Sequence, residues 1–110
     1  MVFFHAGPRG LRAILPPTET GARSSSSYGA DRVCRRDRVY VTTDYPSAVG
    51  FASLVPGGGT VYEVDPVNPV HDPDCFVPGL SFEAERATIV RELRPKGKVL
   101  KMARKAMLAM

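Results

Sequence analysis

A histidine, a tyrosine and an aspartate are carried by three separate early segments of the chain, each near a strand-like run. His5 closes an apolar run, Tyr40 lies inside a run of β-branched residues, and Asp72 follows a third such run in a loop. Ala6 and Gly7, directly after His5, would let a ligand approach the backbone closely. If the three elements are neighbours in the fold, these side chains could converge on one cleft and bind a polar ligand there.

Each of the three residues also has a structural explanation. A histidine near an N-terminal strand is often structural or exposed, and a tyrosine in a β-branched run often belongs to the core or to a sheet face. An aspartate in the sequence His-Asp-Pro-Asp often forms a turn. Only the arrangement of the three elements can decide between binding and packing.

The stretch RVYVTTDYPSAVGFA, residues 38–52, predicts a strand followed at once by a helix. Its first half is β-branched or aromatic without a break, which is the composition of a strand. Asp44 can cap the helix, Pro46 suits its first turn, and small side chains follow. Tyr40 is thereby placed near a strand-to-helix junction.

The remaining elements are predicted to be mostly strands. Further strands are expected at residues 2–5, 60–64, 80–84 and 86–93. The last two could also be one strand, broken near Glu85. Residues 98–110 are rich in Ala, Leu, Met and Lys, which favours a helix, although their first half could be a strand. With long polar loops at 18–37 and 65–79, this balance indicates a single α+β domain spanning 1–110.

Composition excludes several classes of protein. The chain has 110 residues, of which 44% are hydrophobic and 24% charged, as in a globular domain. No apolar run approaches the ~20 residues of a membrane span, and the opening MVFFHAG does not predict a signal peptide. Cys34 and Cys75 stand in no metal-binding or disulfide pattern. We therefore expect a cytoplasmic protein that binds no metal.

Charge is unevenly distributed along the chain. Residues 1–44 carry a net charge of +3, residues 45–85 carry −6 without a Lys or Arg, and residues 86–110 carry +7. Such a basic end could attract nucleic acid or another polyanion, although a solvated face is the commoner meaning.

The C-terminal segment is amphipathic if it is helical. Val99, Met102, Ala106 and Ala109 would then fall near one face, with Leu100, Ala103 and Met107 beside it and Lys98, Lys101 and Lys105 on the far side. We expect this apolar side to dock on the domain.

Four segments in order resemble a known family: FFHAG…GLRAILPP, RVYVTTDYPSAVGFA, GGGTVYEVDPVNPVHDPD and SFEAERATIV. They are similar to the small bacterial ADP-ribosyltransferases of the rifamycin ADP-ribosyltransferase type, over roughly residues 3–93. The resemblance implies a split, twisted β-sheet fold around a nicotinamide pocket and a histidine, a tyrosine and an acid as site residues. It also implies transfer of ADP-ribose from NAD to an acceptor, a rifamycin-type antibiotic or a macromolecule, with release of nicotinamide.

The resemblance assigns roles to individual residues. His5 matches a histidine that hydrogen-bonds the nicotinamide ribose, and the backbone at Ala6 and Gly7 would hold the carboxamide. Tyr40 matches a tyrosine that stacks on the nicotinamide ring, and Phe51 or the small residues beside it would line the opposite wall.

Two acids compete for the catalytic role in this resemblance. Asp72 matches the family's aspartate, and Glu83 is the alternative because related transferases carry a glutamate on a later strand. Breaking the nicotinamide–ribose bond leaves an oxocarbenium-like sugar, whose charge a nearby carboxylate stabilises without a metal.

The remaining cofactor contacts are cations and a hydroxyl. Arg9, Arg12 and Arg23 could bind the pyrophosphate of NAD, and Ser47 is one of the small residues expected to line the pocket. A non-catalytic nucleotide-binding or nucleic-acid-interacting module on the same fold is the alternative function.

Overall fold

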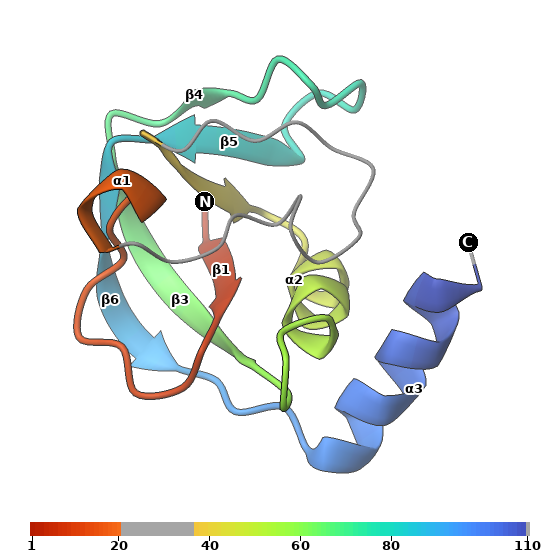
Figure 1. Cartoon of the computed structure of the whole chain (residues 1–110). Coiled ribbons are helices and arrows are strands. Elements are labelled where there is room, and N and C mark those ends of the chain that lie inside the picture. The colour runs from red at the N-terminus through yellow and green to blue at the C-terminus, as the bar shows by residue number, and fades with distance from the viewer. Residues whose placement is uncertain (21–36, 110) are drawn as a thin grey trace.

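An antiparallel sheet with helices α2 and α3 on one side forms the domain (Figure 1). The computed structural model describes residues 1–20 and 37–109. Its strands are β1 (Phe3–Gly7), β2 (Val39–Thr42), β3 (Thr60–Val67), β4 (Val70–His71), β5 (Ser81–Ala84) and β6 (Arg86–Glu92), and its helices are α1 (Pro17–Thr20), α2 (Tyr45–Ser53) and α3 (Gly97–Leu108). The six strands lie in the order β4-β5-β2-β1-β3-β6. The expected α+β class is confirmed.

The two faces of the sheet bury two separate apolar clusters. One cluster contains Ile14, Val39, Val41, Tyr62, Val64, Ala84 and Ala87. The other lies between the sheet and helices α2 and α3, and contains Ala48, Val49, Ala52, Val61 and Leu100. Because side chains alternate along a strand, Val39 and Val41 enter the first cluster and Tyr40 points to the other face.

The strand-to-helix junction after β2 forms as its sequence predicts. Asp44 lies just before α2, and its Oδ2 accepts hydrogen bonds from the backbone N and from the hydroxyl of Ser47, at 3.0 and 2.5 Å. Pro46 lies in the first turn, where its missing N–H costs nothing. This local cap fixes where the chain leaves β2.

Helix α3 packs on α2 through part of its expected apolar side. Leu100 is buried and Met107 is half-buried against α2, where a Cβ on Gly50 would lie 3.0 Å from Sδ of Met107. Val99 and Met102 remain 44% and 66% exposed. The prediction of a docked helix is confirmed, but the buried face is that of Leu100 and Met107, and Gly50, which has no side chain, leaves the space that Met107 fills.

The observed elements refine the expected ones at other positions too. β4 lies inside the predicted loop 65–79, and β3 extends through Pro66, paired with β6. Residues 81–92 form two strands separated at Glu85, which settles the open alternative. Of the predicted loop 18–37, residues 21–36 lie outside the described part of the chain, and helix α1 covers its start. No helix in the described part is long and apolar enough to cross a membrane.

Candidate functional site

Strands β1 and β2 diverge at the point where His5 lies. β1 pairs with β3 along five residues, whereas its only register pair with β2 in the described residues is Phe4↔Thr42. A regular ladder would continue with Ala6 opposite Tyr40. Instead, Nδ1 of His5 lies 2.8 Å from the backbone oxygen of Tyr40. The imidazole therefore occupies the place of a ladder hydrogen bond between two separating strands.

The contact of His5 with Tyr40 determines which nitrogen carries the proton. A backbone oxygen accepts only, so Nδ1 must donate, which leaves Nε2 as an acceptor in the neutral ring. Burial lowers the pKa of His5 below its ordinary value of 6.5, more than the hydrogen bond to Tyr40 raises it. The ring is therefore neutral at neutral pH, with a lone pair on Nε2.

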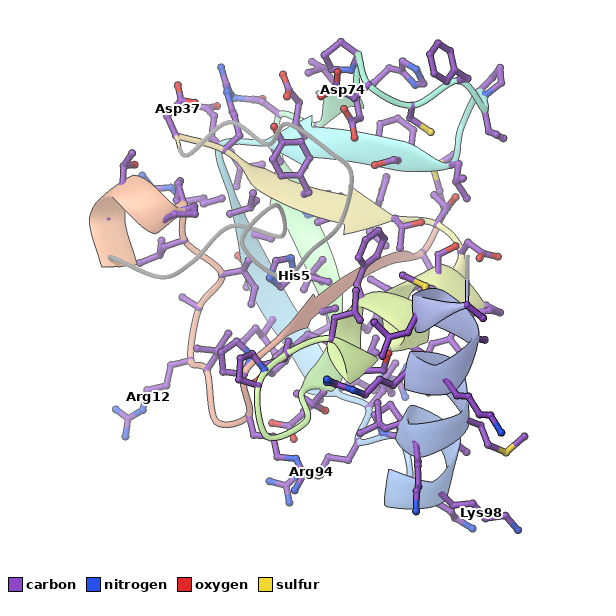
Figure 2. All side chains as sticks on the ribbon, turned by 45° about the vertical axis from the view of Figure 1, so that its right-hand side comes forward. His5, Arg12, Asp37, Asp74, Arg94 and Lys98 are labelled. Atoms are coloured by element: carbon purple, nitrogen blue, oxygen red, sulfur yellow. The ribbon has the colours of Figure 1, made fainter. Side chains whose placement is uncertain are left out.

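The space beside Nε2 is kept by Gly7. A Cβ at Gly7 would lie 3.5 Å from Nε2 of His5 and 3.4 Å from Cδ1 of Leu11. Figure 2 shows His5 near the centre of the sheet, well inside the outline of the molecule. Glycine at this position leaves room beside Nε2, the imidazole nitrogen that has no hydrogen-bond partner among residues 1–20 and 37–109.

Tyr40 connects His5 to Glu83. Tyr40 and Glu83 are register partners on β2 and β5, so their side chains share a face of the sheet. The hydroxyl of Tyr40 donates to Oε2 of Glu83 at 3.3 Å, and Glu83 is only 6% exposed. Tyr40 thus contacts the histidine through its carbonyl and the carboxylate through its hydroxyl.

The geometry defines the relation of His5 to Tyr40 more closely than the sequence does. The prediction that both lie on neighbouring strands is confirmed by the pairing of β1 with β2. His5 is opposite Tyr62, whose ring enters the first apolar cluster, whereas Tyr40 points to the other face. The contact is therefore between a ring and a backbone, not between two rings.

Asp72 lies in the turn that connects β4 to β5. Its carboxylate is fully buried and accepts hydrogen bonds from the backbone N of Asp74 at 2.9 Å and from the hydroxyl of Ser81 at 3.0 Å. Its own backbone N donates to the carbonyl of Ser81. These contacts are those of an aspartate that stabilises a turn. Of the two candidate acids, Glu83 is the one that contacts Tyr40.

Three other residues that the resemblance assigns to the cofactor site lie on or near helix α2. Ala6 packs toward α2, and Phe51 is half-buried on that helix. Ser47 lies in the first turn of the same helix and donates to the capping carboxylate of Asp44.

The expected pyrophosphate contacts lie at the surface or outside the described residues. Arg9 and Arg12 are exposed on the connection after β1, and Figure 2 shows Arg12 pointing away from the molecule. Arg23 lies outside the described residues. The structure thus links His5 to the backbone of Tyr40 and the Tyr40 hydroxyl to Glu83, with the His5 ring on the sheet face opposite to the Tyr40 and Glu83 side chains. The described arginines lie at the surface.

Two buried residues of β3 were not among the sequence candidates. The hydroxyl of Tyr62 donates to the carbonyl of Pro8 at 2.6 Å and accepts from the backbone N of Leu11 at 3.0 Å, which holds the turn after Gly7. Thr60 pairs with Gly7, is fully buried, and has no hydrogen-bond partner for its hydroxyl within the described residues. The strand pattern at 60–64 predicts their burial but not these contacts.

The described part of the chain has a hollow away from these residues and no metal-binding group. A hollow of about 280 Å³ near α1 is lined by Glu19, Arg38, Glu85 and Arg86 among others, and includes none of the candidate residues. Within residues 1–20 and 37–109, no group of three His, Cys, Asp or Glu side chains is arranged to hold a metal ion.

Comparison with known proteins adds no assignment. No protein-family model matches the chain, and no curated protein matches it significantly. The geometry around Tyr40 is therefore the basis for a functional proposal.

Proposed function

We propose that the chain is an NAD-dependent ADP-ribosyltransferase whose site residues are His5, Tyr40 and Glu83. It would transfer ADP-ribose from NAD to an acceptor and release nicotinamide. One observation carries the proposal: Tyr40 contacts His5 through its carbonyl and Glu83 through its hydroxyl, across the adjacent strands β1, β2 and β5. Among residues 1–20 and 37–109, β1 and β2 share a single register pair, which supports a split sheet of the type that the sequence resemblance implies.

Each residue has a role that follows from its protonation and contacts. The neutral Nε2 of His5 would accept a hydrogen bond from a ribose hydroxyl and so fix the sugar, which accelerates reaction by positioning. The backbone at Ala6 and Gly7 would hold the carboxamide of nicotinamide. The Tyr40 ring would stack on nicotinamide, and its hydroxyl orients the carboxylate of Glu83.

The reaction needs a negative charge near the anomeric carbon. When the nicotinamide–ribose bond breaks, its electron pair leaves with neutral nicotinamide and the sugar becomes oxocarbenium-like. The carboxylate of Glu83 would stabilise this charge until the acceptor attacks the same carbon and loses its proton. We assign this role to Glu83 rather than Asp72, because the two carboxylate oxygens of Asp72 accept hydrogen bonds from Asp74 in the same turn and from Ser81 at the start of β5.

Nicotinamide release from NAD tests the proposal directly. We expect release by the full chain, measured by chromatography, and a loss of turnover of about a hundredfold or more in Glu83→Gln with NAD affinity nearly unchanged. Glu85→Gln is the matched control, because Glu85 is an exposed surface acid that hydrogen-bonds Asn68. Its turnover should equal that of the wild type.

Three results would contradict parts of the assignment. Binding of NAD without release of nicotinamide would indicate a non-catalytic nucleotide-binding module. Equal activity of Glu83→Gln and Glu85→Gln would show that Glu83 is not a catalytic residue. A large loss in Asp72→Asn with full activity in Glu83→Gln would move the catalytic role to the turn after β4. Adding rifampicin and measuring its mass tests an antibiotic as the acceptor.

A further inference from the structure

Helix α3 presents a row of exposed lysines to the solvent. Its residues include Lys98, Lys101, Arg104 and Lys105 and no acid. At about 100° per residue, Lys98, Lys101 and Lys105 fall within an arc of about 60°, and we call these three residues the lysine face. The face lies opposite Leu100 and Met107, which pack on α2. Figure 2 shows Lys98 pointing away from the rest of the molecule.

The charges of the lysine face are not neutralised by ion pairs within the described residues. The ion pairs nearest in sequence are Arg94 with Glu92 and Arg91 with Glu63, both before the helix begins. Arg104 reaches the carbonyl of Ser53 instead. A ligand that supplies negative charge would therefore meet the lysines without displacing an acid of the described part of the chain.

Helix stability explains only one of the three lysines. A cation near the C-terminal end of a helix is favoured by the helix dipole, and Lys105 lies in the last turn. Lys98 lies in the first turn, where a positive charge is unfavourable and where α3 has neither an acid nor a side-chain cap. The positive charge of Lys98 thus lowers the stability of the first turn of α3, and a bound anion would offset this loss.

The order of side chains around the exposed half of α3 distinguishes between two anionic partners. A helix that lies on a bilayer has apolar side chains at the centre of its exposed side and lysines at the rim. In α3 the lysines are central, and Met102 and Leu108, 66% and 65% exposed, lie on either side. This order suits a phosphate backbone, with apolar contact to sugars or bases at the flanks.

We infer that the lysine face of α3 binds the phosphate backbone of nucleic acid without sequence preference. From Lys98 to Lys105 the helix rises about 10 Å at 1.5 Å per residue, which is long enough to follow consecutive phosphates of one strand. A phosphodiester chain offers one negative charge per nucleotide, the regular row that the lysines match. The face is formed by residues other than His5, Tyr40 and Glu83, so the inference does not depend on the proposed activity.

Fluorescence anisotropy with a labelled, mixed-sequence 20-nucleotide single strand tests the inference. For the full chain, the logarithm of the binding constant should fall with the logarithm of salt concentration with a slope of about −2, since three neutralised phosphates contribute about −0.7 each. In Lys98→Gln/Lys101→Gln the slope should shrink by about 1.4, and affinity at 50 mM salt should fall at least about tenfold.

The control removes the same charge elsewhere. Arg86→Gln/Arg91→Gln changes two exposed residues of β6, and its slope should stay near that of the wild type. Circular dichroism should show unchanged helix content in both variants. The inference is overturned by an equal loss in the two variants, by wild-type binding in the lysine variant, or by no binding at 50 mM salt. Equal competition by polyglutamate of the same charge would assign the face to an acidic protein instead.

Discussion

Replacing Gly7 by alanine adds one methyl group beside Nε2 of His5, and its two expected effects have opposite signs. The new Cβ would lie 3.4 Å from Cδ1 of Leu11 and 3.5 Å from Nε2, which are ordinary van der Waals distances. The φ angle of Gly7 lies outside the left-handed region. Alanine therefore fits without strain and, by restricting the unfolded chain, should raise the free energy of unfolding by about 0.4–1 kcal/mol.

The same methyl group occupies the approach to Nε2. A ribose hydroxyl that donates to this nitrogen must place its oxygen about 3 Å from it, and an oxygen on the Gly7 side of the ring would collide with the methyl group. Loss of one hydrogen bond of about 1.4 kcal/mol corresponds to a tenfold change. We therefore expect kcat/KM for nicotinamide release to fall about tenfold in a variant that is at least as stable as the wild type.

Urea denaturation and nicotinamide release measure the two effects separately. Gly10→Ala is the control, because Gly10 has a φ of 78° and no atom within 4 Å of its added Cβ. It should lose about 1–2 kcal/mol of stability from backbone strain without covering Nε2. Wild-type kcat/KM in Gly7→Ala, or a loss of more than about 1 kcal/mol of its stability, would refute this account of the space beside His5.

Substitutions at three other residues test the contacts around this site. The pKa of His5 is lower in the folded protein than in the unfolded chain, where it is near 6.5. As pH falls below 6.5, His5 is therefore protonated in the unfolded chain before it is protonated in the folded protein. Stability should be constant above that pH and decline below it. Urea melts between pH 5 and 8 should show a weaker decline in His5→Asn, whose amide can still donate to Tyr40, and an unchanged decline would exclude His5 as its source. Tyr40→Phe removes the hydrogen-bond donor to Glu83. It should lower the free energy of unfolding, measured by urea denaturation, by about 1–3 kcal/mol and should also lower turnover. Wild-type stability and wild-type turnover in this variant would contradict a functional contact. Asp44→Ala removes the cap on Ser47 and should cost about 1 kcal/mol with turnover unchanged, whereas Asp44→Asn should retain most of the stability.

Local sequence was sufficient for elements whose determinants lie within a few residues of one another. Asp44 caps α2 through Ser47, three residues away, and both the strand before it and the helix after it were predicted. The break at Glu85 was also visible, although not whether it separates two strands. β4 was missed because two residues among prolines and aspartates carry no strand pattern.

The candidate site depended on contacts between distant parts of the chain. Histidine, tyrosine and two acids were visible as residue types, but the sequence could not choose between Asp72 and Glu83. The register of β2 with β5 brings Tyr40 opposite Glu83, 43 positions later, and our proposal of Glu83 rests on that contact. Pattern alone also could not tell which apolar side of α3 docks, because that side packs against residues of another helix, among them Gly50 next to Met107. Residue types and short-range spacing determine the elements, whereas pairing across the sheet and between helices decides which side chains meet.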